Sequence, residues 1–177
     1  MTPALAGAAD PASCELALSL PTVLPHLWRF ALRLTGNKHD AEDLVQRACI
    51  RALERRHQLQ SGSSTRSWMF AIVHTVWLNE IRARQVRNHA SLQEGRLVAT
   101  LVDSSRADPE TNALHQQVIA AFEALPEAQR AVMLLVAVEG LSYREAAQVL
   151  DVPVGTVMSR LSRARLTIGE AFGAASC

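Results

Sequence analysis

The segment from Leu141 to Ile168 constrains the fold most tightly, because two short amphipathic helices joined by a turn can be read from it. Ser142 and Glu145 stand three residues apart, which is the spacing of a capping box at the start of a helix. Ala146 is small enough for two helices to cross closely, and Pro153 suits the first turn of a second helix. The segment predicts a helix-turn-helix, with an ordinary helical hairpin as the alternative.

The second of these helices divides into two faces. Four apolar residues recur at helical spacing on the face that would meet a core: Val157, Leu161, Ala164 and Ile168. Another face carries hydroxyl and arginine side chains, which are suitable donors to bases and phosphates. A helix-turn-helix places its second helix in the major groove. We therefore expect DNA contacts from Gly155, Thr156, Ser159, Arg160 and Arg163.

Helical periodicity also runs through the rest of the chain, and alternating strand-like runs are nearly absent. With 177 residues, of which 49% are hydrophobic, the chain can bury one medium core or two small ones. We expect an all-α protein of two small helical domains. The expected parts are a flexible leader at 1–20, a first domain at 21–87, a flexible linker at 88–112, a second domain at 113–172 and a tail at 173–177.

Turn residues mark the helices of the first domain. Pro21 and Pro25 bracket the expected start of the first helix, and Gly36 is a suitable C-terminal cap for it. Asp40 is expected to cap the second helix and Thr65 the third. The apolar stripe of the second helix is expected to contain Ala41, Leu44, Val45, Ala48, Cys49, Ala52 and Leu53.

The distribution of charge says more than the net charge, which is only +1. Residues 51–87 contain seven arginines against two acids, and residues 156–168 contain three arginines and no acid. Two separated basic segments suit two contacts with a phosphate backbone. Two solvated helix faces would give the same pattern, so charge alone does not decide.

Several classes of site have no signature in this sequence. The three cysteines and six histidines do not fall at metal-ligand spacing, and neither a phosphate-binding glycine loop nor a nucleophile arrangement can be read. We expect a protein that is not an enzyme, with no metal, no cofactor and no small-molecule substrate. Because no apolar run reaches membrane-spanning length and no signal peptide is visible, we expect a cytoplasmic protein without direct membrane insertion.

Two parts of the chain resemble the extracytoplasmic-function sigma factors, the short group of the sigma-70 family. LSYREAAQVLDVPVGTVMSRLSRAR, with LPEAQRAVMLLVAVEGLSY upstream, resembles region 4 of that family. LWRFALRLTGNKHDAEDLVQRACIRAL and TRSWMFAIVHTVWLNEIRAR resemble region 2. The resemblance covers Leu24–Arg87 and Leu114–Ile168. It implies an alternative sigma factor that binds the clamp helices and flap of core RNA polymerase, directs promoter-specific initiation and is controlled by an anti-sigma factor.

The resemblance also assigns roles to residues. In the family, region 2 binds the polymerase clamp helices, which implies contacts from Asp43, Leu44, Gln46 and Arg47. Region 2 also melts the −10 element and reads it as single-stranded DNA with one base flipped into a pocket. The corresponding residues here are Gln60, Ser63, Arg66, His74, Thr75, Asn79 and Arg82. Region 4 reads the −35 element with the second helix of its helix-turn-helix.

Three positions depart from the usual family pattern. Thr75 stands where asparagine is common, Asn79 where aspartate is common, and Met158 where a basic residue is frequent. The promoter sequence therefore cannot be predicted. Two other classes stay open: a stand-alone regulator with a sensor domain, and an anti-sigma antagonist or adaptor. The arginine-rich third helix argues against the first, and the intact reading helix argues against the second.

Overall fold

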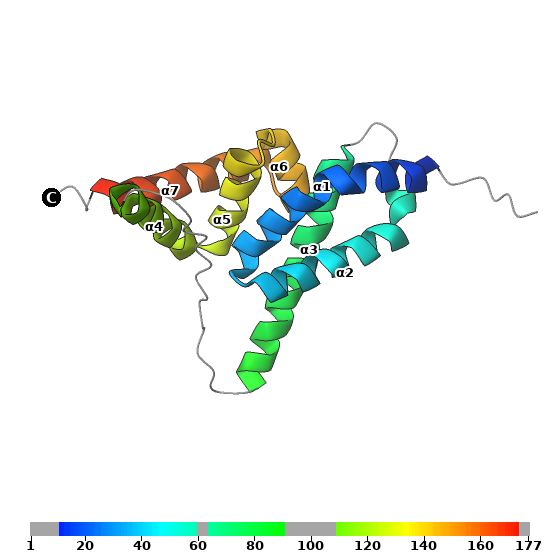
Figure 1. Ribbon diagram of the computed structural model, residues 1–177, viewed down its shortest axis with the longest axis horizontal. Coiled ribbons are helices and arrows are strands. Elements are labelled where there is room, and N and C mark those ends of the chain that lie inside the picture. The colour runs from blue at the N-terminus through cyan, green and yellow to red at the C-terminus, as the bar shows by residue number, and fades with distance from the viewer. Residues whose placement is uncertain (1–10, 60–63, 91–108, 174–177) are drawn as a thin grey trace, which may run out of the picture.

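The computed structural model describes residues 11–59, 64–90 and 109–173, and the side chains of 11–15, 87–90, 109–115 and 171–173 lie outside the description. Every regular element in the described part is a helix, as predicted (Figure 1). Residues 1–10 of the expected leader at 1–20, most of the linker and nearly all of the tail lie outside the described residues, whereas residues 11–20, which were expected to be flexible, are helical. The elements are α1 (Pro11–Thr35), α2 (Lys38–Glu54), the 3-10 turn η1 (Arg56–Gln58), α3 (Thr65–Ala90), α4 (Pro109–Ala124), α5 (Glu127–Met133), the π turn η2 (Leu134–Val138), α6 (Tyr143–Leu150) and α7 (Val154–Gly173).

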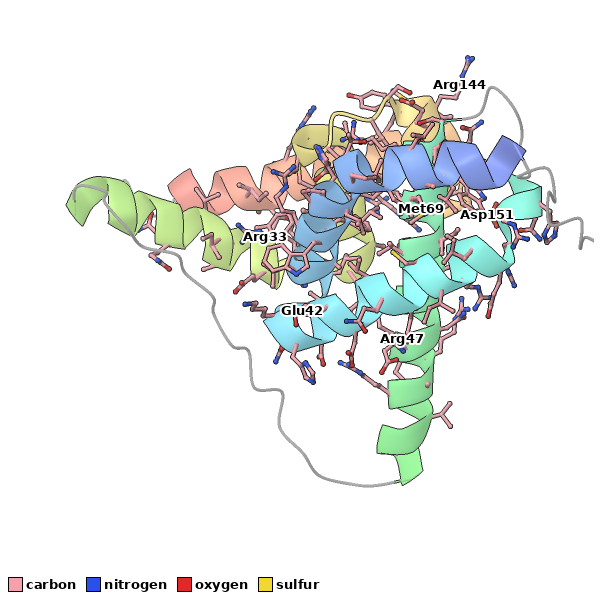
Figure 2. All side chains as sticks on the ribbon, turned by 45° about the vertical axis from the view of Figure 1, so that its right-hand side comes forward. Arg33, Glu42, Arg47, Met69, Arg144 and Asp151 are labelled. Carbon is pink, nitrogen blue, oxygen red and sulfur yellow. The ribbon has the colours of Figure 1, made fainter. Side chains whose placement is uncertain are left out.

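Helices α1, α2 and α3 form a bundle in the first half of the chain. Its largest buried side chains include Phe30 and Phe70, whose rings meet edge to face with their centroids 5.2 Å apart. This geometry is favourable for aromatic pairs beyond the area that they bury. Met69 lies inside the bundle, whereas Glu42 and Arg47 stand on the exposed side of α2 (Figure 2). The bundle thus presents one face of α2 outward.

The ends of these helices agree only in part with the predictions. Gly36 adopts a φ of +68°, and its N–H donates to Leu32 O, so the predicted cap of α1 is confirmed. Helix α1 begins at Pro11, ten residues before its predicted start, and it contains Pro21 and Pro25. The cap of α2 is Asn37, whose side chain accepts from two backbone N–H groups, and not Asp40, which lies in the first turn. Ser64 caps α3 in place of Thr65, since Ser64 Oγ accepts from the N–H of Ser67.

The predicted apolar stripe of α2 is correct except at its end. Five of its residues are buried, and Cys49 is half-buried. Leu53, however, is 51% exposed, and so is not part of the core. Leu53 lies in the last turn of α2, and sequence spacing carries no information about where the neighbouring helices stop covering a stripe.

Helices α4 to α7 form the second half, with α7 packed against α4, α5 and α6. The two halves touch: α6 lies against α3, and α1 contacts both α5 and η2 (Figure 1). Buried apolar residues from α1 to α3 and from α5 to α7 belong to one continuous cluster. The two halves are thus folded onto each other.

Candidate nucleic-acid interface

Helices α6 and α7 are set by strong local signals. Ser142 Oγ accepts from the N–H of Glu145, and the Glu145 carboxylate accepts from the N–H of Ser142 at 2.8 Å, which completes the predicted capping box. These hydrogen bonds from Ser142 lower the pKa of Glu145. Asp151 ends α6 in the left-handed region with a φ of 51°, which turns the chain sharply into α7. The predicted helix-turn-helix is therefore present.

The two faces of α7 are separated as the spacing predicts. Val157, Leu161 and Ala164 are buried against the other helices of the second half, and Ile168 is half-buried. Gly155, Ser159 and Arg163 are exposed, whereas Thr156 and Arg160 are half-buried. Met158, at 54% exposed, stands beside them as an apolar group on an otherwise polar face.

The candidate −10 residues on α3 fall on two sides of the helix. Thr75, Asn79 and Arg82 are exposed on one side, and the hydroxyl of Thr75 donates to Ala71 O at 2.8 Å. Arg66 and His74 lie on the side that meets the second half of the molecule. Gln60 and Ser63 lie outside the described residues. Only part of the predicted −10 surface is therefore open to solvent in this conformation.

His74 cannot touch DNA in this conformation, which corrects its predicted accessibility. Its side chain is buried, at 7% exposed. Burial, followed by the nearby positive charge of Arg160, lowers the pKa of His74 from 6.5 to about 4. Arg160 belongs to the helix expected to read −35. One residue from each predicted DNA surface, His74 and Arg160, therefore lies at the boundary between the two halves.

Glu139 is the most buried charged group of the boundary, and its side chain is only 1% exposed. One carboxylate oxygen, Oε2, accepts from Arg66 Nη2 at 2.9 Å and lies 2.7 Å from His26 Nδ1. Arg66 Nη2 also donates to the backbone carbonyl of Glu139 at 2.6 Å. Sequence reasoning missed this residue, although a lone acid after the apolar run at 132–138 is a signal for a buried partner.

A second acid, Glu127 on α5, lies at the same boundary. Burial raises the pKa of Glu127, and the neighbouring Trp77 indole and Arg130 guanidinium offset part of that rise. Trp77 is buried and belongs to α3. In the described part of the molecule, no acceptor lies in hydrogen-bonding geometry with Trp77 Nε1, so its contact with Glu127 is weaker than a hydrogen bond. Polar groups of the boundary are thus only partly satisfied.

The candidate polymerase-binding residues lie on α2. Asp43, Gln46 and Arg47 are exposed. Leu44 is 0% exposed and packs inside the bundle, so its prediction as a contact residue is wrong for this conformation. Leu44 was predicted both as a buried residue of the apolar stripe and as a polymerase contact, and one side chain cannot do both in the same conformation. Apolar surface beside the exposed residues comes instead from Ile50 and Leu53.

A hollow of about 410 Å³ lies between α2 and α3. Charged groups cross one side of it: Arg47 Nη1 donates to Glu80 Oε2 at 2.7 Å, and Arg84 Nε donates to Glu80 Oε1 at 3.0 Å. The hydrogen bond from Arg47 is the main cause that lowers the pKa of Glu80. Asn79, a candidate −10 residue, also lines the hollow with Ile50. The hollow therefore adjoins both the α2 surface and the exposed side of α3.

In the part of the chain that the structure describes, His, Cys, Asp and Glu side chains form no cluster of three or more that could hold a metal ion. None of the described helices is both long and apolar enough to cross a membrane.

Comparisons with known proteins agree with this architecture. Sigma-70 region 2 matches residues 22–87, and Sigma-70 region 4 matches residues 115–168. The chain is 33% identical over 155 residues to the ECF RNA polymerase sigma factor EcfG of Rhodopseudomonas palustris. The aligned residues cover 88% of this chain and 83% of EcfG. It is 34% identical over 140 residues to the ECF RNA polymerase sigma factor SigE of Mycolicibacterium smegmatis, covering 78% of this chain and 54% of SigE.

A solved structure has the same fold. The sigma factor RpoE from Bartonella quintana, in complex with the anti-sigma factor NepR, matches with a TM-score of 0.76 and 27% identity. The match covers 90% of this chain and 97% of that one. Regions 2 and 4 occur in the order of the sigma-70 family, and the chain has the fold of the sigma factor RpoE. This chain therefore belongs to the ECF sigma factors of the sigma-70 family.

Proposed function

We propose that this chain is an alternative sigma factor, which binds core RNA polymerase and directs initiation at its own set of promoters. The observation that carries the proposal is the polar face of α7, where exposed Gly155, Ser159 and Arg163 project from a capped helix-turn-helix. This is the arrangement needed to enter a major groove. Family membership supplies the context of RNA polymerase.

Region 2 supplies the second promoter contact in this proposal. Thr75, Asn79 and Arg82 on α3 are the donors and acceptors for unpaired −10 bases, and Gln60, Ser63 and Arg66 are further proposed contacts with this strand. Hydrogen bonds to base edges and cationic contacts to phosphates suit single-stranded DNA. The exposed Asp43, Gln46 and Arg47 on α2 are the proposed contacts with the polymerase clamp. The polymerase performs the chemistry, so the sigma factor itself needs only binding energy.

Control by an anti-sigma factor is part of the proposal. RpoE from Bartonella quintana was solved in complex with the anti-sigma factor NepR, and this chain covers 97% of that sigma factor. We propose the cytoplasm as the site of action, because that is where bacterial RNA polymerase works.

Run-off transcription with purified core polymerase tests this function directly. Genomic fragments are transcribed with and without the protein, and the start sites are mapped. We expect defined start sites that appear only when both core and this protein are present, and recovery of core polymerase in a pull-down. Failure to bind core would refute the proposal. Tight duplex binding without polymerase would instead indicate a stand-alone regulator.

A further inference from the structure

The side chain of Glu139 joins the two halves of the molecule. It belongs to the second half, yet both of its side-chain partners, His26 on α1 and Arg66 on α3, belong to the first. With its proton on Nδ1, the His26 imidazole can donate to the carboxylate, and Arg29 Nη2, which lies 2.9 Å from the same nitrogen, then finds no acceptor there. Two side chains of the first half, one from α1 and one from α3, thus meet at one buried carboxylate of the second.

This ionic contact is incompletely satisfied. Glu139 Oε1 and Arg66 Nε are both buried, and neither has a hydrogen-bond partner among the described residues. Removing the Glu139 carboxylate from water is costly although the Arg66 side chain stays 37% exposed, and the cost is recovered only when the polar atoms are paired. A contact of this kind holds two surfaces in one register without binding them irreversibly, so it suits a conformational switch.

Arg66 is also one of the residues proposed to contact the −10 strand. A guanidinium binds a carboxylate through the same N–H groups with which it binds a phosphate. While Arg66 Nη2 donates to Glu139 Oε2, that donor is withheld from DNA. His74, on the same side of α3, is buried by the same packing. Glu139 and a DNA phosphate therefore compete for one group.

The closed arrangement also conflicts with simultaneous reading of two promoter elements. Their names place them about 25 base pairs apart, which is roughly 85 Å along B-form DNA at about 3.4 Å for each base pair. In the structure, α6 of the helix-turn-helix packs against α3, and Arg160 of α7 is near enough to the buried His74 to lower its pKa. The two surfaces must separate before both can engage one promoter.

We propose that Glu139 is an intramolecular latch, which holds region 4 on region 2 and masks Arg66 from single-stranded promoter DNA until core polymerase separates the two halves. The inference rests on the proposed function, since it assigns Arg66 to DNA. A charged hydrogen bond of this kind shifts a two-state equilibrium by roughly tenfold or more. Loss of the latch should therefore open the free protein and raise its affinity for single strands by about that factor.

The test compares Glu139→Gln with Glu170→Gln in the full chain. Glu170 is exposed on α7, so its replacement makes the same change in net charge without touching the boundary. The readouts are the radius of gyration from small-angle X-ray scattering and the Kd for a labelled single-stranded oligonucleotide of mixed sequence, at one salt concentration. We expect Glu139→Gln alone to enlarge the radius and to tighten binding about tenfold. An unchanged radius, or equal gains in both variants, would overturn the latch.

Arg66→Gln separates opening from DNA contact. It removes the same ion pair from the other side, so it should enlarge the radius as Glu139→Gln does but without tightening DNA binding. His26→Asn, a milder change, should enlarge the radius less, and it keeps the proposal testable if either main variant fails to fold by circular dichroism. A compact His26→Asn and a compact Arg66→Gln would together exclude the latch.

Run-off transcription by the wild type keeps the two proposals distinct. If the wild type initiates with core polymerase while Glu139→Gln stays compact, the latch fails and the sigma function stands. If the wild type neither binds core nor initiates, the proposed function fails whatever the scattering shows.

Discussion

His74 illustrates how its surroundings change the chemistry of a single side chain. In sequence it borders a polar helical face and looks available for DNA. In the structure it is buried beside Arg160, and both burial and that positive charge disfavour the imidazolium form. Its neutral state is therefore coupled to the closed, folded molecule. This coupling makes stability depend on pH.

We predict that His74→Gln flattens the pH dependence of stability. The pKa of His74 is about 4 in the fold and 6.5 in an unfolded chain, so its contribution is full above pH 6.5 and is lost as pH falls toward 4. Between pH 7 and pH 5 the loss should be about 2 kcal/mol. Urea unfolding of wild type and variant at both pH values measures it.

The matched control for that experiment is His39→Gln, because His39 is an exposed histidine at the start of α2. Equal flattening in both variants, or a wild-type stability that does not decline between pH 7 and pH 5, would contradict the role given to His74.

At the scale of elements, the helix-turn-helix is built from local signals that reinforce one another. The Ser142–Glu145 capping box begins α6, the left-handed Asp151 ends it, and α7 follows at once. Each signal acts within a few residues of the chain. This is why the two helices could be placed from sequence.

Ser142→Ala should destabilise the protein by about 1 kcal/mol, because it leaves the N–H of Glu145 without its acceptor. Thermal unfolding followed by circular dichroism measures the change. Ser162→Ala is the control, since Ser162 is exposed in the middle of α7 and alanine favours a helix. A control variant as unstable as Ser142→Ala would show that the cap contributes nothing specific.

Arg160→Ala combined with Arg163→Ala should lower −35-dependent run-off transcription by about tenfold or more while leaving core binding intact. Each lost base or phosphate contact costs about 1–3 kcal/mol. Transcription is measured on a mapped promoter, and core binding by pull-down. If core binding fell equally, α7 would not be a dedicated DNA reader.

Asp43→Ala combined with Gln46→Ala on α2 should have the opposite profile. Core binding should weaken by about tenfold, because two exposed polar contacts are removed from the proposed clamp surface. Transcription at saturating protein should then recover, which is the behaviour of a binding defect. Recovery is measured by titrating the sigma factor, and failure to recover would indicate a role beyond core binding.

At the scale of the whole molecule, the two halves cover part of each other's proposed ligand surfaces, most completely at His74. The boundary joins His26 and Arg66 to Glu139, and one apolar cluster continues across it. Apolar burial supplies most of the attraction, at roughly 25 cal/mol for each Å², and the ionic contact fixes the register. Core polymerase must provide enough binding energy to offset both.

This arrangement predicts that His74 becomes reactive when core polymerase binds. In the free protein, burial should slow modification of its imidazole by diethylpyrocarbonate. In the polymerase complex without DNA, separated halves should expose it, and mass spectrometry should detect a several-fold faster modification. Equal protection of His74 in both states would mean that the halves stay together on the polymerase.

The sequence by itself determined which segments are helical and which faces are apolar, because helix capping and helical periodicity depend on residues three or four positions apart. The capping box of α6 and the turn at Gly36 are of this kind. The prediction was wrong at the start of α2, where two nearby residues can both cap a helix and Asn37 does so in place of Asp40.

Only the tertiary structure decided which of those faces are covered. Leu44 is buried while Leu53 is exposed, although both fit one stripe. His26 and Glu139 meet across 113 residues of chain, and no local rule connects positions so far apart. Burial and ionic pairing across the boundary come from chain segments packed together in space. The sequence therefore identified the two helices that we propose bind DNA, α3 and α7, and the fold packed α6, the other helix of the helix-turn-helix, against α3.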